Sequence, residues 1–394
     1  MEQMKFEQGD LQQEAPKRIK KRQLPRRRLR ALAVVAAAVL AVVAAFVLLD
    51  RTAFDGLRRS IAYMQAEKDE SGCARLFQYS SDGSSRYADL NGSLLVASAN
   101  EITLLDDKGN AVYHTALQFS QVALSAADGQ AAVYEIGGRT LYLLNSRGLV
   151  QQMDLEGDIF AVQMGQGGRF AVTLKKTGYK TTVSVYNGKG EPLYDFNSAQ
   201  SYLLTAAVSE NGKYMAAAAM SQDNGSFVSS LQIYKLTSET MAAEGTLEGG
   251  VYEMGTVGGR FCAATDKALY FVKTDGTVTS YDFQGASLSR CGLGADKFAA
   301  VLLENYASGG QTHLAIVNAA GEEISSMAVD SEVLDLSAAG RYLAVLYSNK
   351  LVIYDQKLRE CAVLEDVSSA RRVLMRSDGS AVLAGTNAAS LYLP

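Results

Sequence analysis

The chain has 394 residues, of which 48% are apolar, and its formal net charge is −4. It contains only two histidines, His114 and His313, and both lie in strand-like runs without a partner pattern nearby. A His-rich metal centre and a Ser-His-Asp nucleophile both need histidine, so we expect no catalytic residue and no metal site.

The N-terminal part differs from the rest of the chain. Residues 1–30 carry ten Lys or Arg against four Asp or Glu, and residues 31–49 are 19 apolar residues without a charge. As a helix this segment spans about 28 Å, close to the roughly 30 Å of a bilayer core. Positive charge gathers on the cytoplasmic side of a span. We therefore predict a basic cytoplasmic tail (1–30), one transmembrane helix (31–49) and an extracellular remainder in a single-pass cell-membrane protein.

Two alternatives to this anchor fit less well. A cleaved signal peptide has an apolar region of about 7 to 15 residues behind a short basic head. A buried core helix needs other helices around it, and no other segment looks sufficiently helical. The row Ala33, Ala37, Ala41 and Ala45 has the spacing that permits close helix approach, so a homo-oligomer through the anchor is a further expectation. Because the segment is rich in alanine, that row can also be accidental.

A linker joins the anchor to the rest of the chain over residues 50–72. Phe54, Leu57, Ile61 and Met64 follow helical spacing behind a candidate N-cap, Asp55. We predict an amphipathic helix here that covers the base of the following domain. A helix lying on the membrane surface is the poorer alternative, because the basic and acidic residues of the segment balance.

The remainder, residues 73–394, repeats one pattern. A small-residue turn, usually with Gly, precedes a short run rich in apolar residues, at intervals of 37 to 47 residues. The turns lie at Gly92, Gly129, Gly168, Gly212, Gly259, Asp296, Gly340 and Gly379. A period near 40 residues with several short strands in each unit is typical of β-propeller blades. The fold class is thus all-β, an eight-bladed β-propeller behind one transmembrane α-helix; seven blades is the alternative, since the first unit is weak.

Each unit divides into four strands, except the last. The chain stops at "SLYLP", after what should be the third strand of the last unit, while "CARLFQY" from Cys73 precedes the first complete unit. We predict that this N-terminal stretch pairs with the strand near Leu391. Such pairing closes the ring and removes an open sheet edge.

The four cysteines form no CxxC pair. Cys262 takes an apolar strand position in the repeat, so we expect it in the core. The sequence does not determine whether Cys73, Cys291 and Cys361 form disulfides.

The organisation resembles the WD40-like and quinoprotein-like propeller superfamily. No Trp is present, however, and the tryptophan motifs of quinoproteins are missing with it, so the comparison implies no cofactor. The basic tail, the alanine-rich anchor, "FDGLRRSIAYMQ" and the Trp-free repeat together resemble an uncharacterised family of single-pass membrane proteins from Gram-positive bacteria. That resemblance supports the architecture and implies no activity.

We expect a non-enzymatic, membrane-anchored scaffold that binds a protein or glycan of the cell envelope. The bilayer is a partner through the anchor, and nucleic acid is not expected as a partner. An envelope hydrolase or lyase on a propeller scaffold is the alternative.

Three units have a lengthened link between the second and third strands, at residues 175–181, 221–229 and 304–312, and binding residues are expected there. The candidates are Lys176, Tyr179, Asn224, Phe227, Asn305 and Tyr306. Equally, these links can be tolerated insertions, since Gly, Ser and Asn dominate them.

Overall fold

The computed structural model describes residues 63, 69–70, 72–223, 225–305 and 310–394. The basic tail, the membrane helix and most of the linker predicted over 50–72 lie outside these ranges. Within them, no helix has the length and apolar character needed to cross a membrane.

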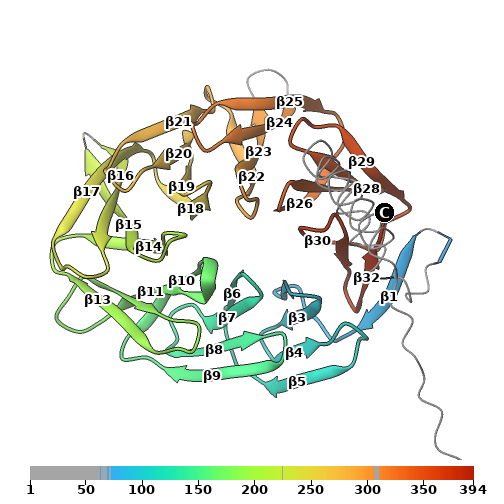
Figure 1. Ribbon diagram of the computed structural model, residues 1–394, viewed down its shortest axis with the longest axis horizontal. Coiled ribbons are helices and arrows are strands. Elements are labelled where there is room, and N and C mark those ends of the chain that lie inside the picture. Colours follow the sequence, from blue (N-terminus) through green and yellow to red (C-terminus); the bar gives the residue numbers. More distant parts are fainter. Residues whose placement is uncertain (1–62, 64–68, 71, 224, 306–309) are drawn as a thin grey trace, which may run out of the picture. The chain divides into compact units, whose positions relative to one another are not determined.

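The described residues form 32 β-strands in eight antiparallel sheets of four strands, arranged as a ring of blades (Figure 1). Blades 1 to 7 each contain four consecutive strands, from β2–β5 to β26–β29, and blade 8 contains β30, β31, β32 and β1. In blades 1 to 4 the strands are β2 (Arg86–Leu90), β3 (Ser93–Ala97), β4 (Glu101–Leu105), β5 (Ala111–Ala116), β6 (Val122–Ala127), β7 (Gln130–Glu135), β8 (Thr140–Asn145), β9 (Gly148–Asp154), β10 (Asp158–Met164), β11 (Phe170–Lys175), β12 (Thr181–Tyr186), β13 (Pro192–Ser198), β14 (Tyr202–Val208), β15 (Tyr214–Asp223), β16 (Ser226–Lys235) and β17 (Met241–Glu248).

The other four blades repeat the same order. Their strands are β18 (Val251–Val257), β19 (Arg260–Thr265), β20 (Ala268–Val272), β21 (Val278–Asp282), β22 (Ser287–Gly292), β23 (Phe298–Asn305), β24 (Gln311–Asn318), β25 (Glu323–Val329), β26 (Val333–Ala339), β27 (Tyr342–Tyr347), β28 (Lys350–Asp355), β29 (Glu360–Glu365), β30 (Arg372–Met375), β31 (Ala381–Ala384), β32 (Ala388–Tyr392) and β1 (Cys73–Gln78). The prediction of eight blades is confirmed, and the alternative of seven is wrong because the weak first unit forms the complete blade 1.

The two ends of the repeat close the ring within blade 8. Strand β1 pairs antiparallel with β32, with Ala74 opposite Leu391 and Phe77 opposite Ala389. This is the predicted closure. Strand β1 is the fourth strand of blade 8, so this blade has the same number of strands as the other seven, and β32 is paired on both sides.

The repeated turns connect the first strand of each blade to its second. At Gly340 the turn requires a left-handed backbone, with φ of 56°, and a Cβ there would lie 3.0 Å from the Cβ of Ser377 in the next blade. Glycine relieves both constraints. At Gly168 the turn contains a three-residue 3₁₀ helix, η1 (Gln166–Gly168), and β11 follows directly.

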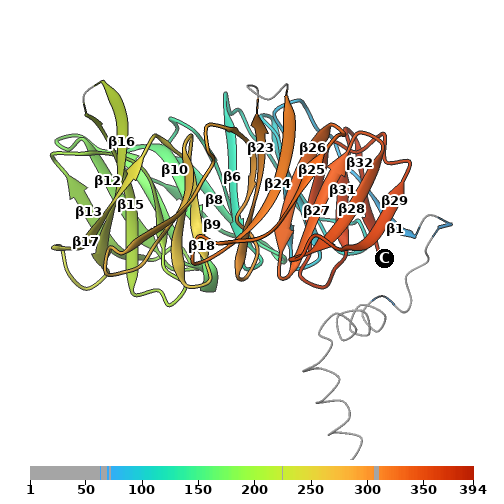
Figure 2. The same cartoon turned by 90° about the horizontal axis from the view of Figure 1, so that it is seen from above.

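Strand direction alternates in each sheet, so the connections fall on two faces of the ring. We call the face with the first-to-second turns the turn face, and the face with the second-to-third links and the crossings between blades the loop face (Figure 2). Arg376, in the turn face of blade 8, donates to the hydroxyl of Tyr63 at 3.1 Å. Tyr63, the first described residue, therefore contacts the turn face.

Apolar side chains fill every boundary between neighbouring blades. Eight clusters of buried side chains occupy the eight boundaries, each with members from both blades. Two examples are Phe170 between blades 2 and 3 and Phe77 between blades 8 and 1. Cys262 is fully buried between blades 5 and 6, as expected. All four cysteines are free thiols.

Candidate functional site

The lengthened links of blades 3 and 4 lie on the loop face and differ in form. Residues 306–309 of the link predicted in blade 6 lie outside the described residues. In blade 3, residues 176–180 form a turn between β11 and β12. In blade 4, the segment expected as a loop is mostly strand, because β15 and β16 stay paired as far as Asp223 and Ser226. The predicted loop of blade 4 is thus an extended hairpin, which Figure 2 shows rising above its neighbours.

The three predicted binding residues that can be described do not form one group. Lys176 and Tyr179 share the link of blade 3, whereas Asn305 ends β23 in blade 6, three blades away. Asn224, Tyr306 and the side chain of Phe227 lie outside the described part of the chain. The Nζ atom of Lys176 pairs with the carboxylate of Glu156, and this hydrogen-bonded ion pair raises the pKa of Lys176 and lowers that of Glu156.

A partly overlapping set of residues forms an exposed aromatic surface on the loop face of blades 3 and 4. Phe160, Tyr179 and Tyr202 are large exposed side chains at the loop-face ends of blades 3 and 4, and Tyr202 is 58% exposed. Lys180 connects the two blades, since its Nζ lies 5.1 Å from the ring centre of Tyr202 and donates to the carbonyl of Gln200 at 2.7 Å. We call these four residues, Phe160, Tyr179, Lys180 and Tyr202, the aromatic patch.

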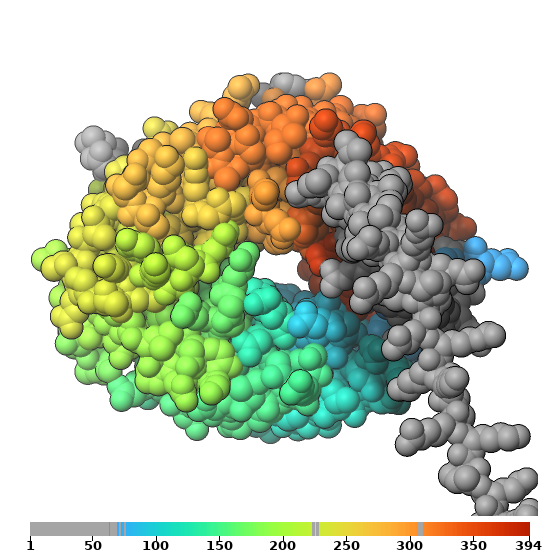
Figure 3. All heavy atoms as spheres, in the orientation of Figure 1, coloured from blue at the N-terminus to red at the C-terminus, as the bar shows by residue number. Residues whose placement is uncertain are grey.

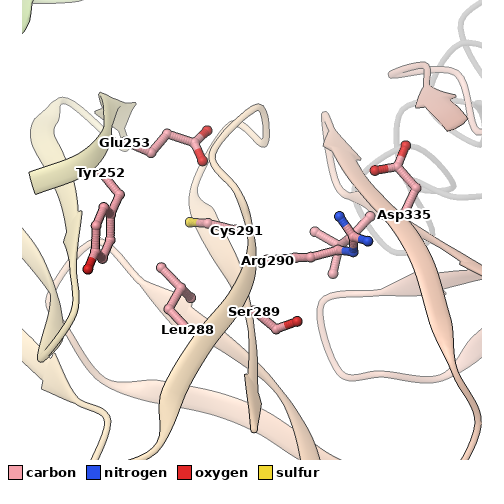
Figure 4. A pocket seen from close by; sticks show the side chains of 8 residues that line it. Tyr252, Glu253, Leu288, Ser289, Arg290, Cys291 and Asp335 are labelled. Carbon is pink, nitrogen blue, oxygen red and sulfur yellow. The ribbon is translucent and has the colours of Figure 1, made fainter. Parts of the chain in front are cut away.

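A polar pocket is the second feature, on the inner strands of blades 5, 6 and 7. It has a volume of about 450 Å³ and is lined by Tyr252, Glu253, Leu288, Ser289, Arg290, Cys291, Asp335 and Leu336 (Figure 4). The inner strands border the hollow at the centre of the ring (Figures 1 and 3). The pocket is within the range of roughly 300 to 1,000 Å³ that is usual for small ligands.

A backbone irregularity sets the direction of the charged side chains in this pocket. Pairing in the three inner strands shifts by one residue immediately before Glu253, Arg290 and Asp335. A bulge of this kind re-aims the side chains next to it. As a result, three charged residues occupy equivalent places in three successive blades.

Glu253 and Arg290 have no hydrogen bond or close ion pair in the described part of the chain, although the charge of Arg290 acts on the carboxylate of Asp335 in the same pocket. No hydrogen bond or ion pair joins either side chain to another described residue, and the buried Nε of Arg290 has no acceptor. Glu253 is open to the water of the hollow, but the protein around it limits hydration and raises its pKa to about 7. Its carboxyl group is therefore partly protonated near neutral pH.

The other two ionisable residues of the pocket are Asp335, which accepts hydrogen bonds from the protein, and Cys291, which has a buried thiol. Asp335 accepts hydrogen bonds from the backbone N–H of Val373 at 2.9 Å and from Arg372 at 3.4 Å. Burial raises the pKa of Asp335 despite these donors. Burial, and then the nearby Glu253, raise the pKa of the Cys291 thiol well above its usual value, so this cysteine is not an activated nucleophile.

The model of one protein family matches residues 70–362 of the chain. The match covers most of the chain and nearly all of the propeller. The chain belongs to the family of unknown function DUF5711. The resemblance to an uncharacterised family is confirmed at this level, and no curated protein matches the chain.

Solved structures similar to this DUF5711 member are propellers. The C-terminal WD40 domain of Sif2 has a TM-score of 0.53 at 12% identity, and covers 81% of this chain and 97% of its own. BamB from Moraxella catarrhalis has a TM-score of 0.52 at 11% identity, and covers 81% of this chain and 98% of its own. At such identities the similarity shows the fold alone.

The polar pocket of this DUF5711 chain was not predicted from the sequence, and of the four residues of the aromatic patch only Tyr179 was predicted. Glu253 and Arg290 lie in the first strand of their repeat units. Polar residues in such a strand are expected whenever one face of the strand is exposed to solvent, so their residue types alone were no reason to single them out. The signal that could have found them is their equivalent position in consecutive units. The two histidines lie on separate blades, with His114 on β5 and His313 on β24.

Proposed function

We propose that this protein is a membrane-anchored binding scaffold, in which residues 31–49 cross the cell membrane and the propeller holds an envelope protein or glycan outside the cytoplasm. The observation that carries the proposal is the aromatic patch. Aromatic side chains with a nearby cation, held on a rigid ring, are typical of surfaces that bind proteins or sugars. Tyr63 contacts the turn face, which is the face opposite the patch.

The aromatic patch has the features of a contact surface for a macromolecule. Phe160, Tyr179 and Tyr202 are exposed at the loop-face ends of two adjacent blades, where a partner can contact them together. Lys180 already lies against Tyr202, so little side-chain freedom is lost when a partner covers this pair. The propeller comparisons are consistent with a scaffold, and the identity of the partner is left to experiment.

Photocrosslinking in cells tests this proposal. A benzophenone amino acid replaces Tyr202 in the full-length protein, and a matched variant carries it at Leu193, an exposed residue on the outer strand β13. We expect a discrete crosslinked partner from position 202 and none from position 193. Equal capture from both positions, or from neither, would contradict a loop-face site.

A further inference from the structure

We propose that the polar pocket of blades 5 to 7 binds a small zwitterion, an amino acid or short peptide with free termini, whose cationic group pairs with Glu253 and whose carboxylate pairs with Arg290. This site is separate from the aromatic patch, which lies on blades 3 and 4. It is also different in kind, since it takes a small molecule rather than an envelope macromolecule.

Two unsatisfied groups point to such a ligand: the buried Nε of Arg290, which has no acceptor among the described residues, and the carboxyl of Glu253, which has no close cation there. Burying a guanidinium Nε without an acceptor costs free energy, as does holding a carboxylate among protein atoms without a cation. Among the residues that the structure describes, neither the Nε of Arg290 nor the carboxyl of Glu253 has a hydrogen-bond partner, and Asp335 acts on the charge of Arg290 only from beyond ion-pair distance. A ligand that supplies both an anion and a cation satisfies both groups at once.

The arrangement of the two charges suits a ligand with separated charges rather than a single ion. Arg290 and Cys291 are successive residues of β22, so their side chains point to opposite sides of the strand. Figure 4 shows Arg290 on the side of Asp335, and Glu253 on the side of Cys291. A ligand that reaches both charges therefore lies across β22 at the inner edge of its blade.

The strand between the two charges favours a peptide-like molecule. Strand β22 pairs only with β23, so its other edge faces the hollow of the ring. Backbone groups at an open strand edge accept and donate hydrogen bonds to an added peptide unit. Tyr252, which is 71% exposed, offers an aromatic ring at the mouth of the pocket for a side chain of the ligand.

Calorimetry with the full-length protein in detergent tests the site directly. The probes are the free amino acids and the dipeptides Ala-Ala, Ala-Tyr, Ala-Glu and Ala-Lys, each compared with its N-acetylated and C-amidated form. We expect at least one zwitterion to bind, and at least a tenfold loss of affinity when either terminus is capped. The separate amino-acid and dipeptide arms show which size of zwitterion the pocket takes.

Three variants locate the binding. Glu253→Gln and Arg290→Gln should each weaken binding at least tenfold, while Arg260→Gln, a nearby arginine that donates to Thr279 outside the pocket, should leave it unchanged. Thermal unfolding by circular dichroism shows that each variant is folded. Because limited hydration raises the pKa of Glu253 to about 7, wild-type affinity should fall from pH 7.5 to pH 5.5 as this carboxyl is protonated. Glu253→Gln should reduce that dependence, and any dependence that remains is assigned to Asp335, whose pKa burial also raises.

Several results would overturn the proposal. They are the absence of binding by any zwitterion to the folded wild type, equal binding of capped and free probes, and equal binding by the two pocket variants and the Arg260→Gln control. None of these outcomes affects capture at Tyr202. A failure here is therefore distinguishable from a failure of the scaffold function.

Discussion

Replacing Arg376 by methionine should lower the free energy of unfolding by about 3 to 5 kcal/mol, the usual cost of removing one partner of a buried ion pair. The side chain of Arg376 is only 8% exposed, and its Nε donates to Asp89 at 2.8 Å. Arg376 belongs to blade 8 and Asp89 to blade 1, so the pair bridges the closing boundary of the ring. The substitution leaves the charge of Asp89, whose side chain is only 16% exposed, without this cationic partner.

The matched control for this variant is Arg359→Met. Arg359 also pairs with an aspartate, Asp355, but its side chain is 73% exposed and the pair lies within a single turn of blade 7. Exposed pairs contribute roughly 0 to 1 kcal/mol. Urea unfolding followed by circular dichroism compares the variants, and the double variant Arg376→Met with Asp89→Leu should recover part of the loss. Equal losses of unfolding free energy in Arg376→Met and Arg359→Met would mean that the Arg376–Asp89 pair does not stabilise the boundary between blades 8 and 1.

The substitution Phe77→Ala should cost about 3 to 5 kcal/mol, because it opens a cavity at the same closing boundary. Phe77 lies on β1 and is only 1% exposed, in the cluster that blades 8 and 1 share. The adjacent residue Leu76 points outward and is 61% exposed. Leu76→Ala is therefore a control on the same strand, and it should change stability by less than about 0.5 kcal/mol.

The pair of variants on β1 tests ring closure as well as stability. If β1 did not pair with β32, Phe77 and Leu76 would be equally exposed, and both substitutions would be mild. Thermal and urea unfolding of the full-length protein give the comparison. A loss confined to Phe77→Ala supports closure by the N-terminal strand, whereas two mild variants would contradict it.

The sequence was sufficient for the blades because each blade is a local unit. Consecutive strands pair with one another, and a left-handed turn such as that at Gly340 leaves a recognisable glycine in seven of the eight copies. Closure by β1 was also predictable, since the repeat ends one strand short and an open edge must be covered. The division of 73–394 into strands followed from these two regularities.

The hairpin of blade 4 shows where composition is ambiguous. The residues around Ser221 and Ser226 are small and polar, as in a loop, yet they pair across β15 and β16. Gly, Ser and Asn occur at the tips of exposed hairpins as well as in irregular loops. Only the presence of a partner strand decides between the two structures.

Both candidate sites depend on contacts between blades, which local patterns do not encode. Lys180 meets Tyr202 because the link of blade 3 lies beside the first residue of blade 4. Glu253 and Arg290 share a pocket because bulges in neighbouring inner strands re-aim them, and a bulge has no fixed sequence signature. Both sites could therefore be recognised only from the arrangement of neighbouring blades in the folded ring.

The most direct test of the scaffold function is the dissociation constant of the captured partner for the full-length protein and two single variants. Tyr202→Ser removes the most exposed ring of the aromatic patch, and Leu193→Ser removes an exposed side chain of the outer strand β13. Loss of a central aromatic contact usually costs more than about 1.4 kcal/mol, which is a tenfold change in affinity. The account predicts that Tyr202→Ser binds the partner at least tenfold more weakly and that Leu193→Ser binds it as the wild type does. Unchanged affinity in Tyr202→Ser, with the variant folded, would contradict the assignment of the loop face as the binding surface.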